Sequence, residues 1–114
     1  MEILDATEAF GSLSQETRLS VLRLLVKAGN TGIPAGEIAV ALKVKANTLS
    51  ANLAVLSRAR LIRSQRQGRV IRYFADMDGI GALVGYLMED CCGGRPELCR
   101  PFVAEMVKEI ACAC

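Results

Sequence analysis

The spacing of apolar residues divides the chain into helical segments with one extended pair between them. Helical spacing occurs over residues 3–10, 15–28, 34–42, 46–59, about 77–91 and from about 101 onward. Residues 61–66 and 69–74 are extended instead, rich in Ile, Val, Tyr and Phe, and Gln67-Gly68 can supply a tight hairpin turn between them. The pattern therefore predicts a mainly α fold with a β-hairpin, in the order α-α-α-α-β-β-α-α.

Residues with cap and breaker preferences mark where the first helices begin and end. Gly11 is expected to stop the first helix, and Ser14 can cap the second. Gly29-Asn30 should end the second helix, since glycine is favoured just after a helix C-terminus. Pro34 fits the first turn of the third helix, because its fixed φ suits that position.

The helix predicted over about 46–59 has two different faces. Leu49, Leu53 and Leu56 stack on one side, which predicts a buried face. The opposite side carries small and polar residues, Asn47, Ala51, Ala54 and Arg58. A tight turn joins this helix to the one before it, so the pair is typical of a helix-turn-helix whose second helix enters the major groove. The hairpin over about 61–75 would then be a wing.

Basic residues are concentrated in this part of the chain. From Lys43 to Ala75 there are eight basic residues and no acidic one, whereas the rest of the chain is acidic. Such a block favours an anion-binding surface, here double-stranded operator DNA. Asn47, Thr48 and Ser50 are the candidates for base-edge contacts. The candidates for phosphate or minor-groove contacts are Lys45, Arg58, Arg66 and Arg69.

Length and the remaining apolar stripes indicate one domain that associates with itself. At 114 residues with 52% hydrophobic side chains, the chain can build one core, so we expect a single domain over 1–114. Apolar stripes near both ends exceed what one core needs, which predicts a homodimer through the terminal helices. Asp76 or Asp78 can cap the dimerisation helix, about 77–91. We expect a cytoplasmic protein, since neither a secretory signal nor a membrane-spanning run occurs.

Several spaced motifs together resemble one known family. The run Val44–Leu56, followed by Ala59–Ile62 and Arg66–Tyr73, resembles the recognition helix and wing of ArsR/SmtB-type metalloregulatory repressors. Thr17-Arg18-Leu19 before a leucine-rich helix is also similar to that family. The resemblance implies a winged helix-turn-helix repressor that leaves its operator when an inducer binds.

The chain departs from the family pattern at two structural positions and at the usual sensing sites. The family commonly has His where Asn52 stands and Gly where Arg60 stands, so the recognition helix must end without the usual left-handed glycine. Many members bind metal through cysteines on the third helix or through Asp and His on the fifth. Residues 34–42 contain no cysteine and the chain contains no histidine, so both sites are absent.

Three cysteines near the end of the dimerisation helix form a different candidate site. Cys91, Cys92 and Cys99 are similar in placement to the cysteines of arsenic-responsive members that follow this helix. Three thiolates suit trivalent arsenic or antimony, which form three bonds to sulfur, whereas zinc prefers four ligands. We expect As(III) or Sb(III) as the inducer and no organic cofactor. Cys112 and Cys114 are left out of this primary site.

The cysteine spacing also carries a mechanical expectation. Successive residues of an intact helix project about 100° apart, so Cys91 and Cys92 can meet at one centre only where the backbone is a loop or unwinds. Gly93-Gly94 permits this. We therefore expect a cysteine loop and a last helix over 91–114. That helix would begin near Pro101 and bury Val103, Met106, Val107 and Ile110, with a free tail from Ala111.

Two alternatives within regulation and one outside it remain open. The same fold could carry a thiol redox sensor, in which Cys91 or Cys92 pairs with Cys99 under oxidant, or a cadmium or zinc sensor. A thiol enzyme or a metal-trafficking protein is disfavoured, because the chain has no Cys-x-x-Cys motif, no histidine base and no phosphate-binding glycine loop. We therefore do not expect an enzyme.

Overall fold

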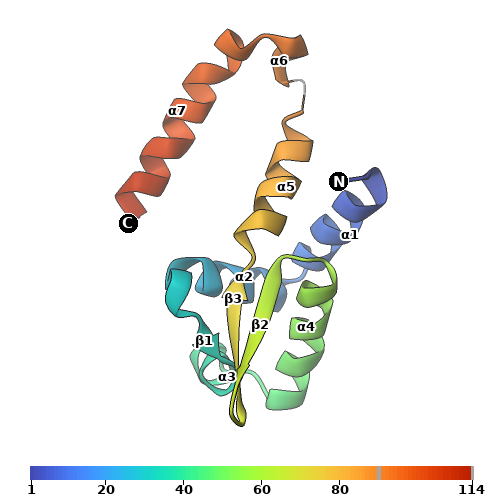
Figure 1. Ribbon diagram of the computed structural model, residues 1–114, viewed down its shortest axis with the longest axis vertical. Coiled ribbons are helices and arrows are strands. Elements are labelled where there is room, and N and C mark those ends of the chain that lie inside the picture. Colours follow the sequence, from blue (N-terminus) through green and yellow to red (C-terminus); the bar gives the residue numbers. More distant parts are fainter. Residues whose placement is uncertain (90, 114) are drawn as a thin grey trace.

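The computed structural model confirms a mainly helical chain with a β-hairpin, and it describes residues 1–89 and 91–113 (Figure 1). In chain order the elements are α1 (Ile3–Leu13), α2 (Glu16–Ala28), the 3-10 turn η1 (Gly29–Thr31), β1 (Ile33–Pro34), α3 (Ala35–Leu42), α4 (Ala46–Arg58), β2 (Ile62–Gln67), β3 (Val70–Ala75), α5 (Met77–Leu87), α6 (Cys91–Gly94) and α7 (Pro96–Ala113). The predicted order of helices and hairpin strands is correct, and η1, β1 and α6 come in addition.

The hairpin belongs to a three-stranded antiparallel sheet with the order β1-β3-β2. The sequence did not predict β1, which pairs Ile33 with Tyr73 and Pro34 with Arg72. The turn also differs from the prediction. Gln67 is the last residue of β2 and pairs with Val70, so the turn residues are Gly68 and Arg69. Only Gly68 has a positive φ, 67°, as the first central residue of a type II′ turn requires.

The core lies where α1, α2, α3 and α4 meet the base of the sheet. Leu49, Leu53 and Leu56 of α4 are all buried, as their spacing predicted. Helices α2 and α3 contribute Val21, Leu22, Leu25 and Ile38, and the core also contains Ala6, Ala9, Leu61, Ile62 and Leu83. Because apolar burial fixes the inner face of α4, the opposite face of that helix is left to solvent.

Three predicted helix ends differ from the structure by one to three residues. Helix α1 continues through Gly11 to Leu13, and the Ser14 hydroxyl donates a hydrogen bond to the Gly11 carbonyl (2.7 Å). Ser14 therefore helps to close α1, and Gln15 caps α2 by accepting the Arg18 backbone N–H at 2.9 Å. Pro34 ends β1 and precedes α3 instead of lying in its first turn. The predicted end of α2 at Gly29 is confirmed.

The C-terminal part differs most from expectation. Asp76 caps α5 by accepting the Gly79 N–H (3.1 Å), as predicted, but α5 ends at Leu87 and not near 91. Cys91 and Cys92 lie in the short helix α6, where a loop was expected. Helix α7 begins at Pro96, since proline suits a first turn, and it continues through Pro101 to Ala113, so residues 111–113 are not a free tail.

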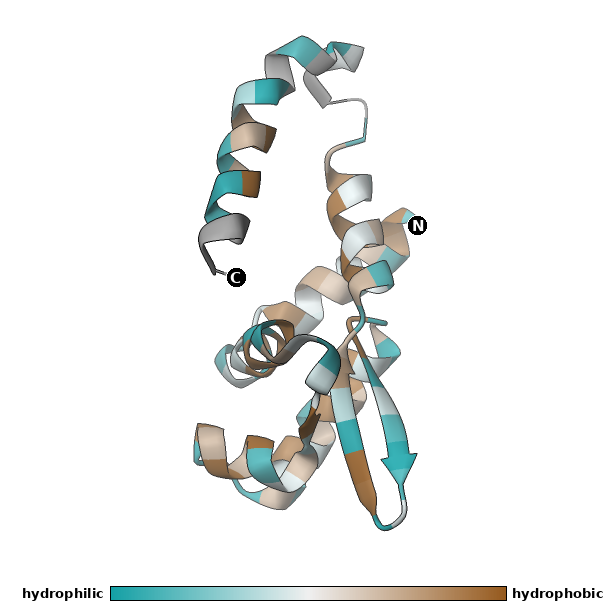
Figure 2. Ribbon diagram, turned by 60° about the vertical axis from the view of Figure 1, so that its left-hand side comes forward, coloured by the Kyte–Doolittle hydropathy of each residue, from teal (hydrophilic) through white to brown (hydrophobic). Residues whose placement is uncertain are grey.

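In the single chain the apolar stripe of α7 is exposed, although its residues were expected to be buried. Val103, Met106 and Val107 are between 38% and 55% exposed, and Ile110 lies outside the residues whose burial is described. Figure 2 shows apolar positions alternating with polar ones along this helix, which runs back in the opposite direction to α5 and apart from it. Large apolar side chains are also exposed on α1 and α5. Within residues 1–89 and 91–113, no helix combines the length and apolar character needed to cross a membrane.

Candidate nucleic-acid interface

The turn between α3 and α4 is held by its own backbone. Lys43 closes α3 in the left-handed conformation (φ 56°), and its N–H points back to the carbonyls of Ala39 and Val40. The Val44 N–H donates to the Ala39 carbonyl at 3.1 Å. These bonds satisfy the last carbonyls of α3 and turn the chain sharply into α4. The two helices therefore form a helix-turn-helix with α4 in the recognition position.

The first half of α4 presents the predicted base-edge candidates to solvent. Asn47, Thr48 and Ser50 are all exposed, and so is Lys45 just before the helix. The Asn47 side-chain oxygen accepts the Thr48 backbone N–H at 2.9 Å, which leaves its NH2 group free to donate to a base acceptor. These four residues share one end of the helix. The structure therefore brings them together on one solvent-facing surface.

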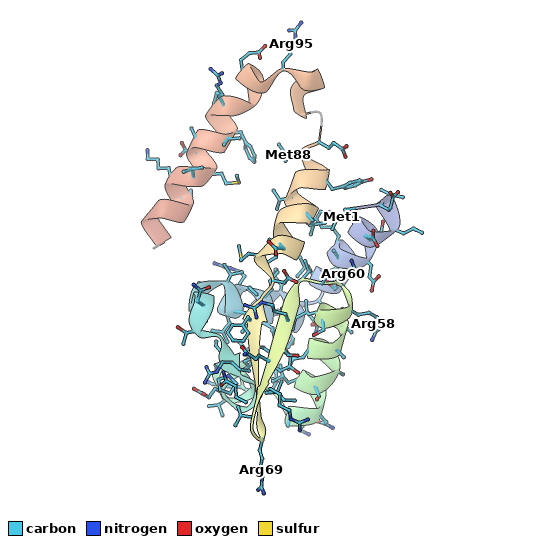
Figure 3. The ribbon with its side chains drawn as sticks, in the orientation of Figure 1. Met1, Arg58, Arg60, Arg69, Met88 and Arg95 are labelled. Atoms are coloured by element: carbon cyan, nitrogen blue, oxygen red, sulfur yellow. The ribbon has the colours of Figure 1, made fainter. Side chains whose placement is uncertain are left out.

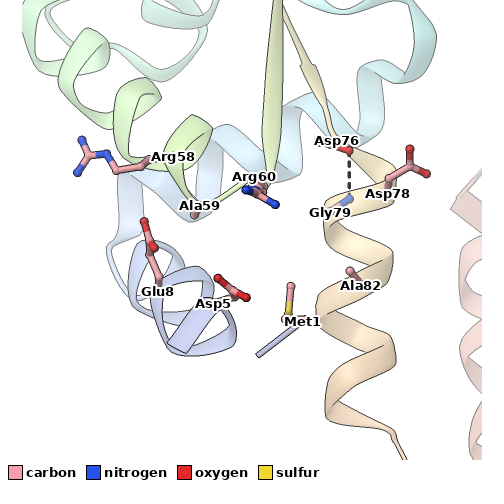
Figure 4. Close-up of a pocket in the computed structure, with 10 residues that line it drawn as sticks. All are labelled: Met1, Asp5, Glu8, Arg58, Ala59, Arg60, Asp76, Asp78, Gly79 and Ala82. Carbon is pink, nitrogen blue, oxygen red and sulfur yellow. Dashed lines mark hydrogen bonds between the residues drawn. The ribbon is translucent and has the colours of Figure 1, made fainter. Parts of the chain in front are cut away.

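Arg58 lies at the other end of α4. The helix rises about 1.5 Å per residue, which puts Arg58 roughly 18 Å from Ala46. It lines a pocket of about 330 Å³ together with Asp5 and Glu8 of α1 (Figure 4). The structure does not bring Arg58 together with the other predicted contacts. A contact from Arg58 would be to a more distant phosphate.

The wing arginines separate into two groups. Arg66 and Arg69 are exposed, and Arg69 stands at the hairpin tip, as Figure 3 shows, while Arg66 donates only to the neighbouring Gly68 carbonyl. Arg72 is held at the base of the wing, where it donates to the carbonyls of Thr31 (3.1 Å) and Gly32 (3.2 Å). The Arg63 guanidinium lies over the Phe74 ring, 4.5 Å from its centroid. Arg66 and Arg69 are thus the wing arginines best placed to reach DNA.

One polar contact behind α4 was missed by the sequence reading. Asn52 is 8% exposed and its side-chain oxygen accepts from Arg18 Nη1 at 3.2 Å. The same guanidinium donates from Nε to the Ser12 carbonyl at 2.6 Å. The signal was the polar Asn52 on the inner face of an amphipathic helix, because a buried amide needs a hydrogen-bond partner.

The end of α4 packs directly on the start of α5. Arg60 adopts the left-handed conformation (φ 63°), so this non-glycine residue reverses the chain where the family commonly has glycine. Its carbonyl oxygen lies against Gly79 so closely that no Cβ fits there. Leu61 accepts the Asp76 N–H (2.9 Å), and Asp76 in turn accepts the Gly79 N–H (Figure 4). The recognition helix and α5 are therefore joined through backbone atoms.

The side chains of the predicted metalloid ligands, Cys91, Cys92 and Cys99, lie outside the described residues, and so do those of Cys112 and Cys114. Their backbone places Cys91 and Cys92 in α6 and Cys99 near the start of α7. Gly93 and Gly94, the last two residues of α6, have positive φ values of 66° and 81°, so the chain changes direction at the end of this helix.

Comparison with known proteins gives one family profile and one curated relative. A family described as "Helix-turn-helix domain" matches residues 13–65, the stretch from the end of α1 into β2. YbzH from Bacillus subtilis (strain 168), an HTH-type transcriptional regulator, is 30% identical over 96 residues, which are 74% of this chain and 96% of YbzH. The match thus extends over nearly the whole of that relative.

Solved structures share the same fold. HlyU from Vibrio cholerae N16961 aligns with a TM-score of 0.63 and 23% identity, covering 81% of this chain and 99% of HlyU. The homodimeric winged helix-turn-helix DNA-binding domain (fragment 1–100) of Mb0332 from Mycobacterium bovis, a possible ArsR-family transcriptional regulator, aligns with a TM-score of 0.61 and 26% identity. That alignment covers 80% of this chain and 84% of the Mb0332 fragment.

Proposed function

Because this chain belongs to the helix-turn-helix transcriptional regulators and has the winged-helix fold of ArsR-type proteins, we propose that it is an operator-binding repressor, released by trivalent arsenic or antimony. As its relatives are DNA-binding regulators, the chain is a regulator and not an enzyme. One observation carries the proposal: the exposed polar start of α4 and the exposed wing residues Arg66 and Arg69 belong to one stretch, residues 43–75, with eight basic residues and no acidic one.

The DNA-binding step follows from how that surface is built. A recognition helix inserts its N-terminal residues into the major groove, where Asn and Ser or Thr side chains hydrogen-bond to base edges. Asn47, Thr48 and Ser50 occupy that end of α4. Arg66 and Arg69 extend from the hairpin toward phosphates or the adjacent minor groove, and Lys45 adds a charge beside the helix.

The active form is a homodimer through the terminal helices. Exposed apolar side chains support this, since Leu4 on α1 is 80% exposed, Leu87 on α5 is 63% exposed, and α7 exposes its own stripe. A second copy covering these faces would remove large apolar surfaces from water. A twofold dimer would also place its two α4 helices on half-sites about one helical turn of DNA apart.

The inducer step uses thiols at the end of the dimerisation helix. Cys91, Cys92 and Cys99 would hold As(III) or Sb(III), replacing three hydroxyls of neutral arsenite with three sulfur bonds and releasing water. Because α6 is helical across Cys91 and Cys92, ligation by both must unwind this turn. Unwinding beside α5 would shift the dimer contacts and move the two α4 helices away from operator spacing.

The experiment is fluorescence anisotropy of the reduced protein on a palindromic DNA from its own promoter, titrated with arsenite. Wild type is compared with Cys91→Ser, Cys92→Ser and Cys99→Ser, and Cys112→Ser is the matched control. We expect arsenite to release the wild type and Cys112→Ser, but none of the other three.

Tight DNA binding that ignores arsenite would keep the repressor and reject the metalloid as inducer. Peroxide and cadmium titrations would then distinguish a redox sensor from a cadmium or zinc sensor. Absence of DNA binding in the reduced protein would reject the repressor itself.

A further inference from the structure

Three helices meet at one guanidinium in the described structure. Arg18 lies in the first turn of α2, its Nε donates to the Ser12 carbonyl at the end of α1, and its Nη1 donates to Asn52 in the middle of α4. Ser12 is 3% exposed and Asn52 is 8% exposed, so both acceptors are buried. We propose that Arg18 is the positioning residue that sets the orientation of the recognition helix relative to α1.

The geometry of the guanidinium makes this role specific to arginine. Its donors lie in one rigid plane, so two acceptors bonded to it are held at a fixed separation. Here the two acceptors belong to α1 and α4. A lysine keeps the charge, but its single ammonium cannot reproduce the fork. Arg18 therefore fixes a relationship between two helices that are far apart in sequence.

Apolar packing fixes which face of α4 is buried, but it leaves small rotations of the helix about its axis weakly specified. Leu49, Leu53 and Leu56 hold the helix against the core, but hydrophobic burial has no directional preference. A hydrogen bond does have one, and Asn52 supplies it one turn beyond the base-edge candidates. Rotation of α4 about its own axis would break the bond to Arg18. The bond therefore sets which way Asn47 and Ser50 face the groove.

The contact also connects the two surfaces that the proposed function uses. Ser12 ends the helix whose N-terminal part exposes Leu4, on the proposed dimer face, while Asn52 belongs to the DNA-reading helix. The inference rests on the proposed DNA-binding function, and it adds a route from α1 to α4. This route is separate from the Arg60–Gly79 junction with α5.

The test uses Arg18→Lys and Asn52→Leu, with Asn52→Asp as the variant that retains the acceptor. Arg23→Lys is the matched control, since Arg23 is exposed on the same helix. The first readout is amide hydrogen exchange of the DNA-free protein, compared between α4 and α3. The second is affinity for promoter DNA and its dependence on salt.

Loss of the bond should act on α4 selectively. Arg18→Lys and Asn52→Leu should raise exchange in α4 about tenfold relative to α3. Operator affinity should fall about tenfold with an unchanged salt slope, because no phosphate contact is lost. Asn52→Asp should stay within about threefold of wild type, and Arg23→Lys should match wild type.

Equal exchange in Arg18→Lys and Arg23→Lys would overturn the proposal, and so would a rise spread evenly over all helices, which indicates a merely structural role. Unchanged operator affinity in Arg18→Lys would also overturn it. If the wild type binds no promoter DNA, the proposed repressor function is rejected. In that case the amide exchange of α4 relative to α3 alone decides whether Arg18 positions the helix.

Discussion

The Arg60 carbonyl oxygen occupies the space in which a side chain at Gly79 would begin. The C-terminal end of α4 and the first turn of α5 thus touch backbone to backbone, with Asp76 bonded to both sides of the contact. Any rearrangement of α5 at this point must displace the end of the recognition helix.

Gly79→Ala should therefore destabilise the fold. The added methyl forces the two segments apart, and overpacking of this kind costs about 1–3 kcal/mol. Gly36→Ala is the control, because nothing lies within 4 Å of a Cβ there and alanine has a higher helix propensity than glycine. Urea unfolding at one fixed protein concentration measures the stability of both variants. Equal midpoints for the two variants would contradict the close contact.

Arg60→Gly should instead stabilise the fold. A non-glycine residue pays roughly 1–2 kcal/mol in the left-handed region, part of which glycine loses again in unfolded-chain entropy. We expect a net gain of about 0.5–1 kcal/mol in the free energy of unfolding. Ala54→Gly, at an exposed position in the interior of α4, should instead lose about 1 kcal/mol. A loss in both variants would show that the Arg60 side chain matters more than its φ.

Substitutions of the wing arginines should differ in how they change the salt dependence of DNA affinity. Arg66→Gln and Arg69→Gln should each flatten the slope of log affinity against log salt by about one unit, the value for one lost phosphate contact. Arg72→Gln should leave the slope unchanged and lower stability, because Arg72 is bonded to the carbonyls before β1. Anisotropy at several salt concentrations, with thermal unfolding, checks both. A flattened slope in Arg72→Gln would place that residue on DNA.

Arsenite should stabilise the protein while disordering α6. A ligand at 100 times its Kd adds about 2.7 kcal/mol to the free energy of unfolding. The wild type should show this stabilisation as a higher Tm when arsenite is added, and Cys99→Ser should not. Amide exchange over residues 91–94 should increase at the same time, since the α6 turn cannot persist with both cysteines bound to one centre. Unchanged exchange in α6 would reject the unwinding step.

Leu87→Glu should convert the protein to a monomer. Leu87 is 63% exposed on α5, and a charge there would be buried against the partner at a high cost. Val40→Glu is the control, as Val40 is 78% exposed on α3, away from the terminal helices. Sedimentation velocity distinguishes the two. A Leu87→Glu protein that remains dimeric would show that Leu87 lies outside the dimer interface.

Periodic elements were predictable, because their apolar spacing reports directly which face is buried. Helix α4 follows this rule. The hairpin was predictable from its extended, β-branched composition instead, since Val70 and Ile71 are exposed. In contrast, β1 has only two residues and forms through pairing with β3, so no alternation of apolar and polar residues predicts it. Helix α1 passes through Gly11 because the cost of a helical glycine, about 1 kcal/mol, is small beside the burial of Ala6 and Ala9.

Contacts between distant residues were not predictable from pattern. The Arg18–Asn52 bond joins residues 34 positions apart, and the sequence shows only an inward-facing amide without naming its partner. For α7 the helical period was read correctly, but a period does not say what covers the stripe. The stripe is exposed in the single chain, and the proposed dimer would cover it.

The residues that stabilise the turn at Lys43 are different from the residues of α4 that are proposed to contact DNA. Its bonds run to the carbonyls of α3, and the leucines of α4 face inward, so the outward positions of α4 contribute little to stability. Under the proposed DNA-binding function, substitutions at Asn47, Ser50 and Ala51 should therefore change the preferred DNA sequence at small cost in stability. Such a chain would be free to acquire new target genes over evolution, and it would serve as a scaffold for selecting regulators with altered operators.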